Sequence, residues 1–113
     1  MVEQTFGSVK KVAFTWLSAA GGAADKVTDN TYNGEILRAV FIPDGGGTQP
    51  SDLYDVALND DDGVDVLGRE AGDLSNAATE QLRNMGAVAN SKLTLAVTNG
   101  GNAKGGLVIV YIR

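Results

Sequence analysis

Apolar and polar side chains alternate along several short stretches of this chain, and this alternation constrains the fold more than any other feature. In residues 9–17, the side chains of Val12, Phe14 and Trp16 share one side, and residues 93–98 show the same period of two. Side chains of a strand point alternately to opposite faces of its sheet, so this period is typical of β-strands. Clusters of Gly, Asn, Asp and Pro separate these stretches. The pattern predicts an all-β fold.

About seven or eight short antiparallel strands are expected, which corresponds to a single-domain β-sandwich with a jelly-roll-like arrangement. Residues 35–42 and 107–112 are apolar on both faces, so we expect two central strands that are covered on each side. The expected strands span residues 9–17, 26–32 (short and polar, at an edge), 35–42, 53–59, 64–67, 79–83, 93–98 and 107–112.

The chain has 113 residues, enough for one domain with one core. We assign residues 9–113 to the β-sandwich and residues 1–8 to an N-terminal arm. Six of the seven aromatic residues lie in or beside strand-like stretches and are expected in the core. Phe6 is the exception, because it lies in the arm, and an apolar residue there indicates docking on a partner. Val2, Phe6 and Lys10 are the predicted partner-binding residues.

Residue types needed for common catalytic and metal sites are missing. The chain contains neither cysteine nor histidine, which excludes thiolate chemistry, histidine bases and histidine metal ligands. Its formal net charge of −5 and its scattered basic residues disfavour binding to nucleic acid. No apolar stretch approaches the roughly 20 residues needed to span a membrane. The composition therefore predicts a protein that is not an enzyme and holds no cofactor.

The stretch LNDDDGVDV, residues 58–66, resembles a calcium loop at first sight. With Gly63 at the sixth position of an EF-hand loop, Leu58 and Arg69 would occupy the two anchoring positions, and neither can bind calcium. Side-chain register instead favours a hairpin with the loop Asp61-Asp62-Gly63 and Gly63 in the left-handed conformation. That hairpin would place Val64 and Val66 on the same face as Leu58. A weak cation site at the aspartates remains a minor alternative, and a catalytic carboxylate pair a weaker one.

Two glycine-rich segments, residues 44–51 and 99–106, are predicted to be flexible connections. The first has no lysine after its last glycine, and the second precedes a strand rather than a helix. Neither context is that of a phosphate-binding loop.

Several segments together resemble a known group of proteins. They are NTYNGEILRAVFIPDGGGTQPSDLYDVALNDDDGVDVLG (30–68), SNAATEQ (75–81), KLTLAVTN (92–99) and GGLVIVYIR (105–113). Their order resembles that of small virion proteins of tailed bacteriophages, over roughly residues 9 to 113. The resemblance implies a small β-sandwich of the capsid decoration or cement type, without an active site.

The resemblance and the composition lead to one functional expectation. We expect a structural protein that is assembled in the host cytoplasm, lies on the capsid surface of the virion and binds the major capsid protein. Self-association is expected as well, with a trimer as the leading arrangement. The alternatives are a tail, neck or fibre-associated virion protein and a carbohydrate-binding β-sandwich.

Overall fold

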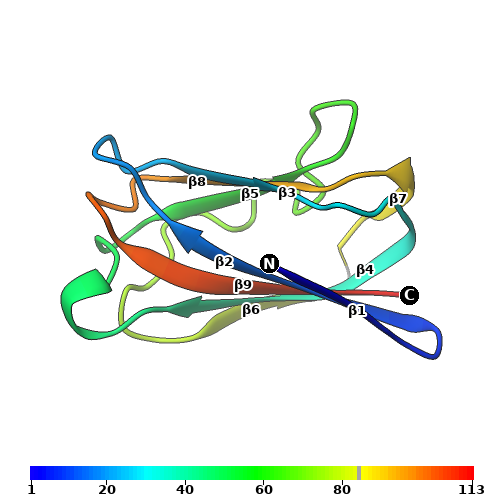
Figure 1. Cartoon of the computed structure of the whole chain (residues 1–113), viewed down its shortest axis with the longest axis horizontal. Helices are drawn as coiled ribbons and strands as arrows, with labels where there is room; N and C mark the ends of the chain where they lie inside the picture. The colour runs from blue at the N-terminus through cyan, green and yellow to red at the C-terminus, as the bar shows by residue number, and fades with distance from the viewer. Residues whose placement is uncertain (84) are drawn as a thin grey trace.

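The computed structural model describes residues 1–83 and 85–113, which form two antiparallel β-sheets packed face to face (Figure 1). The predicted all-β fold, a single-domain β-sandwich, is confirmed. The strands are β1 (Val2–Phe6), β2 (Val9–Leu17), β3 (Ala24–Val27), β4 (Tyr32–Pro43), β5 (Asp55–Asn59), β6 (Glu80–Arg83), β7 (Ala87–Ser91), β8 (Thr94–Thr98) and β9 (Gly105–Ile112), with one 3-10 turn, η1 (Gly46–Thr48).

The larger sheet has the strand order β1-β2-β9-β4-β6, and β7 pairs with the beginning of β4. The smaller sheet has the order β3-β8-β5. Strand β9 is central, because it pairs with β2 along one edge and with β4 along the other. Its red ribbon runs between those two strands in Figure 1.

The core lies between the sheets and is formed by the inward side chains of each strand. Phe14 and Trp16 of β2, Val110 of β9 and Leu95 of β8 are all buried. The ring of Trp16 lies 5.6 Å, between centroids, from the ring of Tyr54, which precedes β5. This contact joins the two sheets at one end of the core.

Most of the predicted strands are present. The prediction for β2 has the observed bounds, and the predictions for β4, β5, β6, β8 and β9 overlap their strands. Residues 64–67 do not form a strand and make only one isolated bridge, between Asn59 and Asp65. The predicted strand at 26–32 is displaced, because β3 ends at Val27. Strand β7 was not predicted.

The segment predicted as an N-terminal arm is part of the sheet instead. Residues Val2–Phe6 pair antiparallel with Val9–Ala13, so the first residues form an edge strand of a hairpin. The sequence did not predict this strand because neither of its faces forms a buried apolar row. One face carries the polar side chains of Glu3 and Thr5, and the side chains of the other face are exposed. Only the pairing with β2, a long-range property of the fold, gives these residues a regular structure.

The prediction that β4 and β9 are covered on each side is wrong for the single chain. Val108 and Val110 of β9 point into the core, whereas Leu107, Ile109 and Tyr111 alternate with them and are half-buried. In the described part of the chain, no strand or helix packs on this second face (Figure 1). An apolar face of the larger sheet is thus left uncovered.

Gly106 offers a test of the core packing. A Cβ atom at this position would lie 2.9 Å from Nε1 of Trp16 and 3.0 Å from the backbone oxygen of Ile42. We expect Gly106→Ala to lower the free energy of unfolding by about 1–3 kcal/mol, because the crowded backbone oxygen cannot move aside. Urea unfolding measures this. Gly47→Ala is the matched control, since its Cβ would meet nothing within 4 Å. Equal stability of the two variants would contradict the packing.

Candidate interaction surface

The face of the larger sheet that points away from the smaller sheet, called the outer face here, carries two apolar rows. Strand register aligns Val2, Ala13, Ile109 and Val40 across β1, β2, β9 and β4. The next row aligns Thr15, Leu107 and Ile42. The exposed Leu17 extends this surface at the end of β2.

A row of cations borders the apolar rows on one side. Lys11 of β2 and Arg38 of β4 both pair with Tyr111 of β9, and Arg38 also pairs with Arg83 of β6. The guanidinium carbon of Arg38 lies 4.5 Å from the centroid of the Tyr111 ring, in a cation–π contact. Tyr111 therefore lies on the outer face, and its predicted place in the core is wrong. Two arginines directly opposite each other repel, so this row favours a negatively charged neighbour.

A carboxylate lies at the other end of the outer face. Asp44 follows β4, and its Oδ2 lies 2.8 Å from the position of a Cβ added at Gly105. Gly105 pairs with the exposed Leu17, so this carboxylate covers the outward side of β9. The Thr48 hydroxyl donates a hydrogen bond to the same oxygen, at 3.1 Å, and holds it in place.

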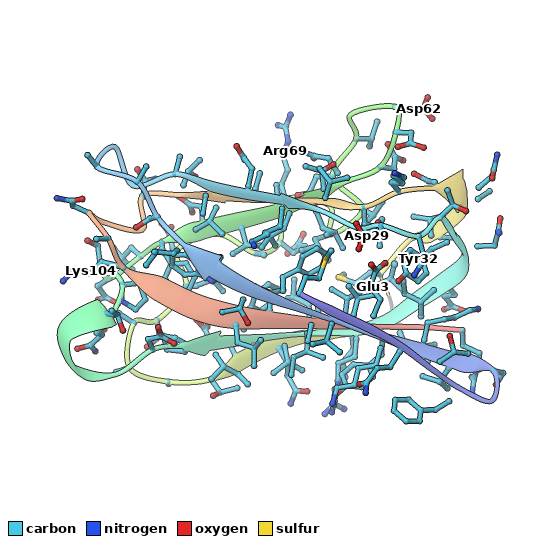
Figure 2. All side chains as sticks on the ribbon, in the orientation of Figure 1. Glu3, Asp29, Tyr32, Asp62, Arg69 and Lys104 are labelled. Atoms are coloured by element: carbon cyan, nitrogen blue, oxygen red, sulfur yellow. The ribbon has the colours of Figure 1, made fainter. Side chains whose placement is uncertain are left out.

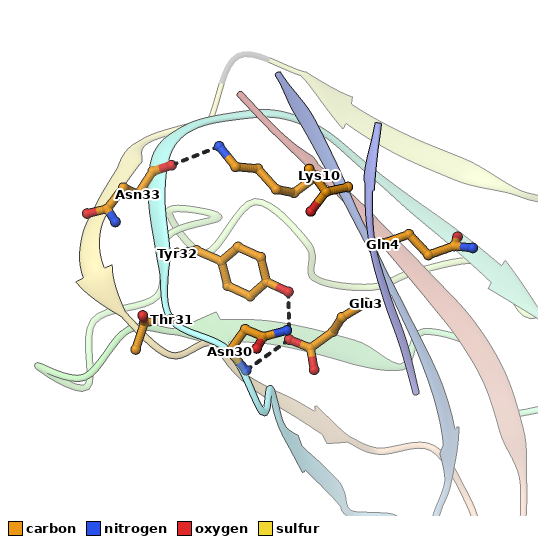
Figure 3. Close-up of a pocket in the computed structure, with 8 residues that line it drawn as sticks. Glu3, Gln4, Lys10, Asn30, Thr31, Tyr32 and Asn33 are labelled. Atoms are coloured by element: carbon orange, nitrogen blue, oxygen red, sulfur yellow. Dashed lines mark hydrogen bonds between the residues drawn. The ribbon is translucent and has the colours of Figure 1, made fainter. Parts of the chain in front are cut away.

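The predicted partner-binding residues fall on two different faces. Val2 and Phe6 point to the outer face and are 52% and 59% exposed. Lys10 points the other way, and its Nζ lies 3.4 Å from the carbonyl oxygen of Asn33 (Figure 3). The structure therefore places Val2 and Phe6 on one face, at opposite ends of β1, and Lys10 on the other face.

Glu3 fastens β1 to the connection between β3 and β4. Its carboxylate accepts a hydrogen bond from the backbone amide of Asp29 at 3.0 Å. It also accepts from the backbone amide of Asn30 at 3.2 Å and from the Tyr32 hydroxyl at 2.6 Å (Figure 3). Partial burial acts to raise the pKa of Glu3, but these hydrogen bonds outweigh it, and the pKa lies below its usual value. Burial raises the pKa of Tyr32, and the neighbouring Glu3 carboxylate raises it further.

An open hollow of about 420 Å³ lies beside this cluster and is a candidate for a polar binding site near the N-terminus. Glu3, Lys10, Asn30 and Tyr32 contribute to its lining (Figure 3). Near neutral pH, Glu3 is ionised and already accepts three hydrogen bonds, and the Tyr32 hydroxyl keeps its proton. These groups hold structure and are not poised to exchange a proton.

The acidic stretch 58–66 forms the predicted loop. The amide of Asp60 donates to the carbonyl of Val64, and the amide of Val66 donates to the carbonyl of Leu58. These are the pairs expected for a hairpin whose loop is Asp61-Asp62-Gly63. Gly63 has a φ of +76°, so its predicted left-handed conformation is confirmed. Leu58 is buried, whereas the side chain of Val64, which was expected on the same face, is 59% exposed. Figure 2 shows Asp62 at the outer tip of this loop.

Most carboxylates around this loop accept hydrogen bonds from the backbone. Asp60 accepts from the amides of residues 62 and 64, and Asp65 accepts from those of residues 58, 67 and 69. Asp55 and Glu80 each accept from one further amide. The bonds that span two to four residues are Asx-type turns, and the others join segments that are further apart in the sequence. In each, the side chain replaces a partner that a strand would supply. Within residues 1–83 and 85–113, no three acidic side chains are placed to hold a metal ion.

Comparisons with known proteins leave the family open. No protein-family model matches the chain, and no curated protein matches it. Among solved structures, it is similar to one described as the crystal structure of FLHE, with 15% identity and a TM-score of 0.40. That match covers 91% of this chain and 97% of the other, and its similarity is too low to carry an argument. In the described residues, no helix has the length and apolar character needed to cross a membrane.

Asp65 tests the role of the carboxylates in the turns. Its two oxygens accept from three backbone amides at 2.9 to 3.0 Å. Asp65→Ala should therefore lower the free energy of unfolding by about 2–3 kcal/mol, because two partly buried donors and one exposed donor lose a charged acceptor. Asp62→Ala, at the loop tip, is the control and should change it by less than about 0.5 kcal/mol. Chemical denaturation of both variants measures the difference, and a similar loss in both would refute the capping role.

Glu3 predicts a pH dependence of stability. Its pKa is lower in the folded state than the usual value of 4.5, so its stabilising effect is present above pH 4.5. The effect is lost as the pH falls through the lower, folded-state pKa. Wild type should be more stable than Glu3→Gln at pH 7, and this advantage should shrink towards pH 3. Thermal melts across that range measure it, and an advantage independent of pH would contradict the assignment.

Proposed function

We propose that this chain is a non-enzymatic structural protein of a tailed-bacteriophage virion, which binds the major capsid protein on the capsid surface and stabilises it. The observation that carries the proposal is the open edge of the larger sheet at β1, where Val2 and Phe6 are exposed on an ordered strand. The proposed location is the virion, with assembly in the host cytoplasm and with self-association of the protein.

Strand β1 has the properties of a docking edge. It is the last strand on its side of the sheet order, so among the described residues its second edge has no partner strand. A strand of a neighbouring protein can pair with such an edge through backbone hydrogen bonds, while pockets receive side chains such as Phe6. The hydrogen bonds of Glu3 hold β1 in place before binding, which lowers the entropic cost of docking.

The architecture and the segment resemblance support the same proposal. A cement protein needs a compact domain, an edge or loops that reach a neighbour, and no catalytic groups. The carboxylates described above are largely engaged by the backbone, which suits a structural role. The resemblance to small virion proteins of tailed phages concerns residues 9–113 and lies outside β1, so the two lines of support are independent.

The alternatives differ in what they require of the surface. A tail, neck or fibre-associated virion protein would use the same fold, and the position of its density in the particle separates it from a capsid protein. A carbohydrate-binding module needs exposed aromatic rings on one face. Here five of the seven aromatic side chains are buried, and Tyr111 lies under Arg38. These observations favour the capsid proposal over the carbohydrate one.

The proposal predicts that particles of the phage encoding this chain contain it. Mass spectrometry of gradient-purified particles should detect the chain, and its absence would overturn the proposal. Particles that lack the chain should rebind the purified protein. Phe6→Asn should weaken this rebinding by about ten-fold or more, because an apolar anchor is lost. Leu53→Asn, which changes another apolar residue that is 55% exposed, is the control and should rebind like wild type.

A further inference from the structure

The uncovered outer face is large enough to receive a partner. It corresponds to about four full strands, spaced about 4.8 Å apart and some eight residues long, or roughly 500 Å² in projection. That area includes the charged ends as well as the apolar rows. It is of the same order as, and somewhat below, the roughly 800 Å² of accessible surface that one partner contributes to a standard interface. Its centre is Leu107 and Ile109 of β9 with Val40 and Ile42 of β4.

The charges on this face are arranged so that the face complements itself. Both charged groups lie over β9, the guanidinium of Arg38 above Tyr111 and the carboxylate of Asp44 above Gly105. Six residues separate these two positions, or about 20 Å along the strand. The apolar rows occupy the interval between them. Cations are thus at one end, an anion at the other, and apolar side chains in the middle.

Only one symmetric arrangement of two copies uses this pattern. A two-fold axis parallel to the strands would place the arginine end over the arginine end. A two-fold axis in the plane of the interface and across the strands, at the level of Val108, reverses the strand direction of one copy. It then places each Arg38 over the Asp44 of the other copy. A closed three-fold ring would need two different complementary patches, whereas this face is a single patch that complements itself.

We propose that a second copy of this chain covers the outer face through that two-fold axis. The apolar rows of the two copies pack against each other, as the sheets of a sandwich do, about 10 Å apart and within about 30° of alignment. Arg38 of each copy pairs with Asp44 of the other at both ends of the interface. The proposed dimer differs from the trimer expected from the sequence. It covers Val2 but leaves the backbone edge of β1 accessible at the side, and Phe6, which pairs with Val9 at the hairpin end, lies beyond the apolar rows.

The first test is the mass of the wild-type protein in solution. Sedimentation equilibrium over a range of micromolar concentrations should give twice the 11.7 kDa of the chain. A monomer at all concentrations, or a trimer, would overturn the proposal.

Charge exchange tests the pairing itself. Arg38→Glu alone and Asp44→Arg alone should each weaken dimerisation by about ten-fold or more, because like charges then face each other at both ends. A 1:1 mixture of the two variants should recover the dimer mass. In the mixed dimer, the glutamate introduced at position 38 of one copy faces the arginine introduced at position 44 of the other, and the native Arg38–Asp44 pair remains at the other end. Lys26→Glu, the same charge change on the exposed side of β3, is the control and should dimerise like wild type.

Two outcomes would refute the charge pairing: single variants that dimerise normally, and a mixture that stays monomeric while both variants remain folded by circular dichroism. Arg38→Gln, which removes the charge without adding repulsion, should weaken the dimer less than Arg38→Glu. These measurements use the protein alone, so they are separable from the proposed function. A dimer that does not bind particles would refute the function only, and a monomer that binds them would refute this inference only.

Discussion

The hydrogen-bonded register of β9 is the constraint on which the rest of the structure depends. This strand pairs with β2 over eight residues on one edge and with β4 on the other. Once that register is formed, alternate side chains of three strands are assigned together, one set to the core and the other to the outer face. A shift by one residue would exchange Val108 and Val110 with Leu107 and Ile109. Because both sets are apolar, burial inside one chain cannot by itself choose between the two registers.

Close contacts around Trp16 resolve that choice. Gly105 and Gly106 have no side chains, so β9 can approach β2 and the Trp16 indole where any Cβ would collide. Gly100 contacts the same ring from the loop before β9. The glycine-rich segment 99–106 thus has a packing role in addition to its role as a connection. The same register brings Arg38 over Tyr111 and Asp44 over Gly105, so the core and the candidate interface depend on one pairing.

The sequence predicted the parts of the fold that depend on local pattern. The alternation of apolar and polar side chains predicted β2 and β8, and the apolar stretch after the last glycines predicted β9. The conformation of Gly63 followed from loop length and register alone. Strands β1 and β7 were missed because their stability comes from pairing with distant residues and not from their own pattern. The place of Asp44 on the outer face also depends on tertiary geometry, and no local spacing reveals it.

The most direct measurement asks whether two copies of the chain contact each other at the outer face. A 1:1 mixture of carbon-13-labelled and unlabelled chains permits isotope-filtered NOE spectra, which report only contacts between different copies. We expect intermolecular NOEs among the methyl groups of Leu107, Ile109, Val40 and Ile42. Their absence from these methyl groups in a sample of dimeric mass, or intermolecular NOEs confined to the smaller sheet, would contradict the proposed dimer.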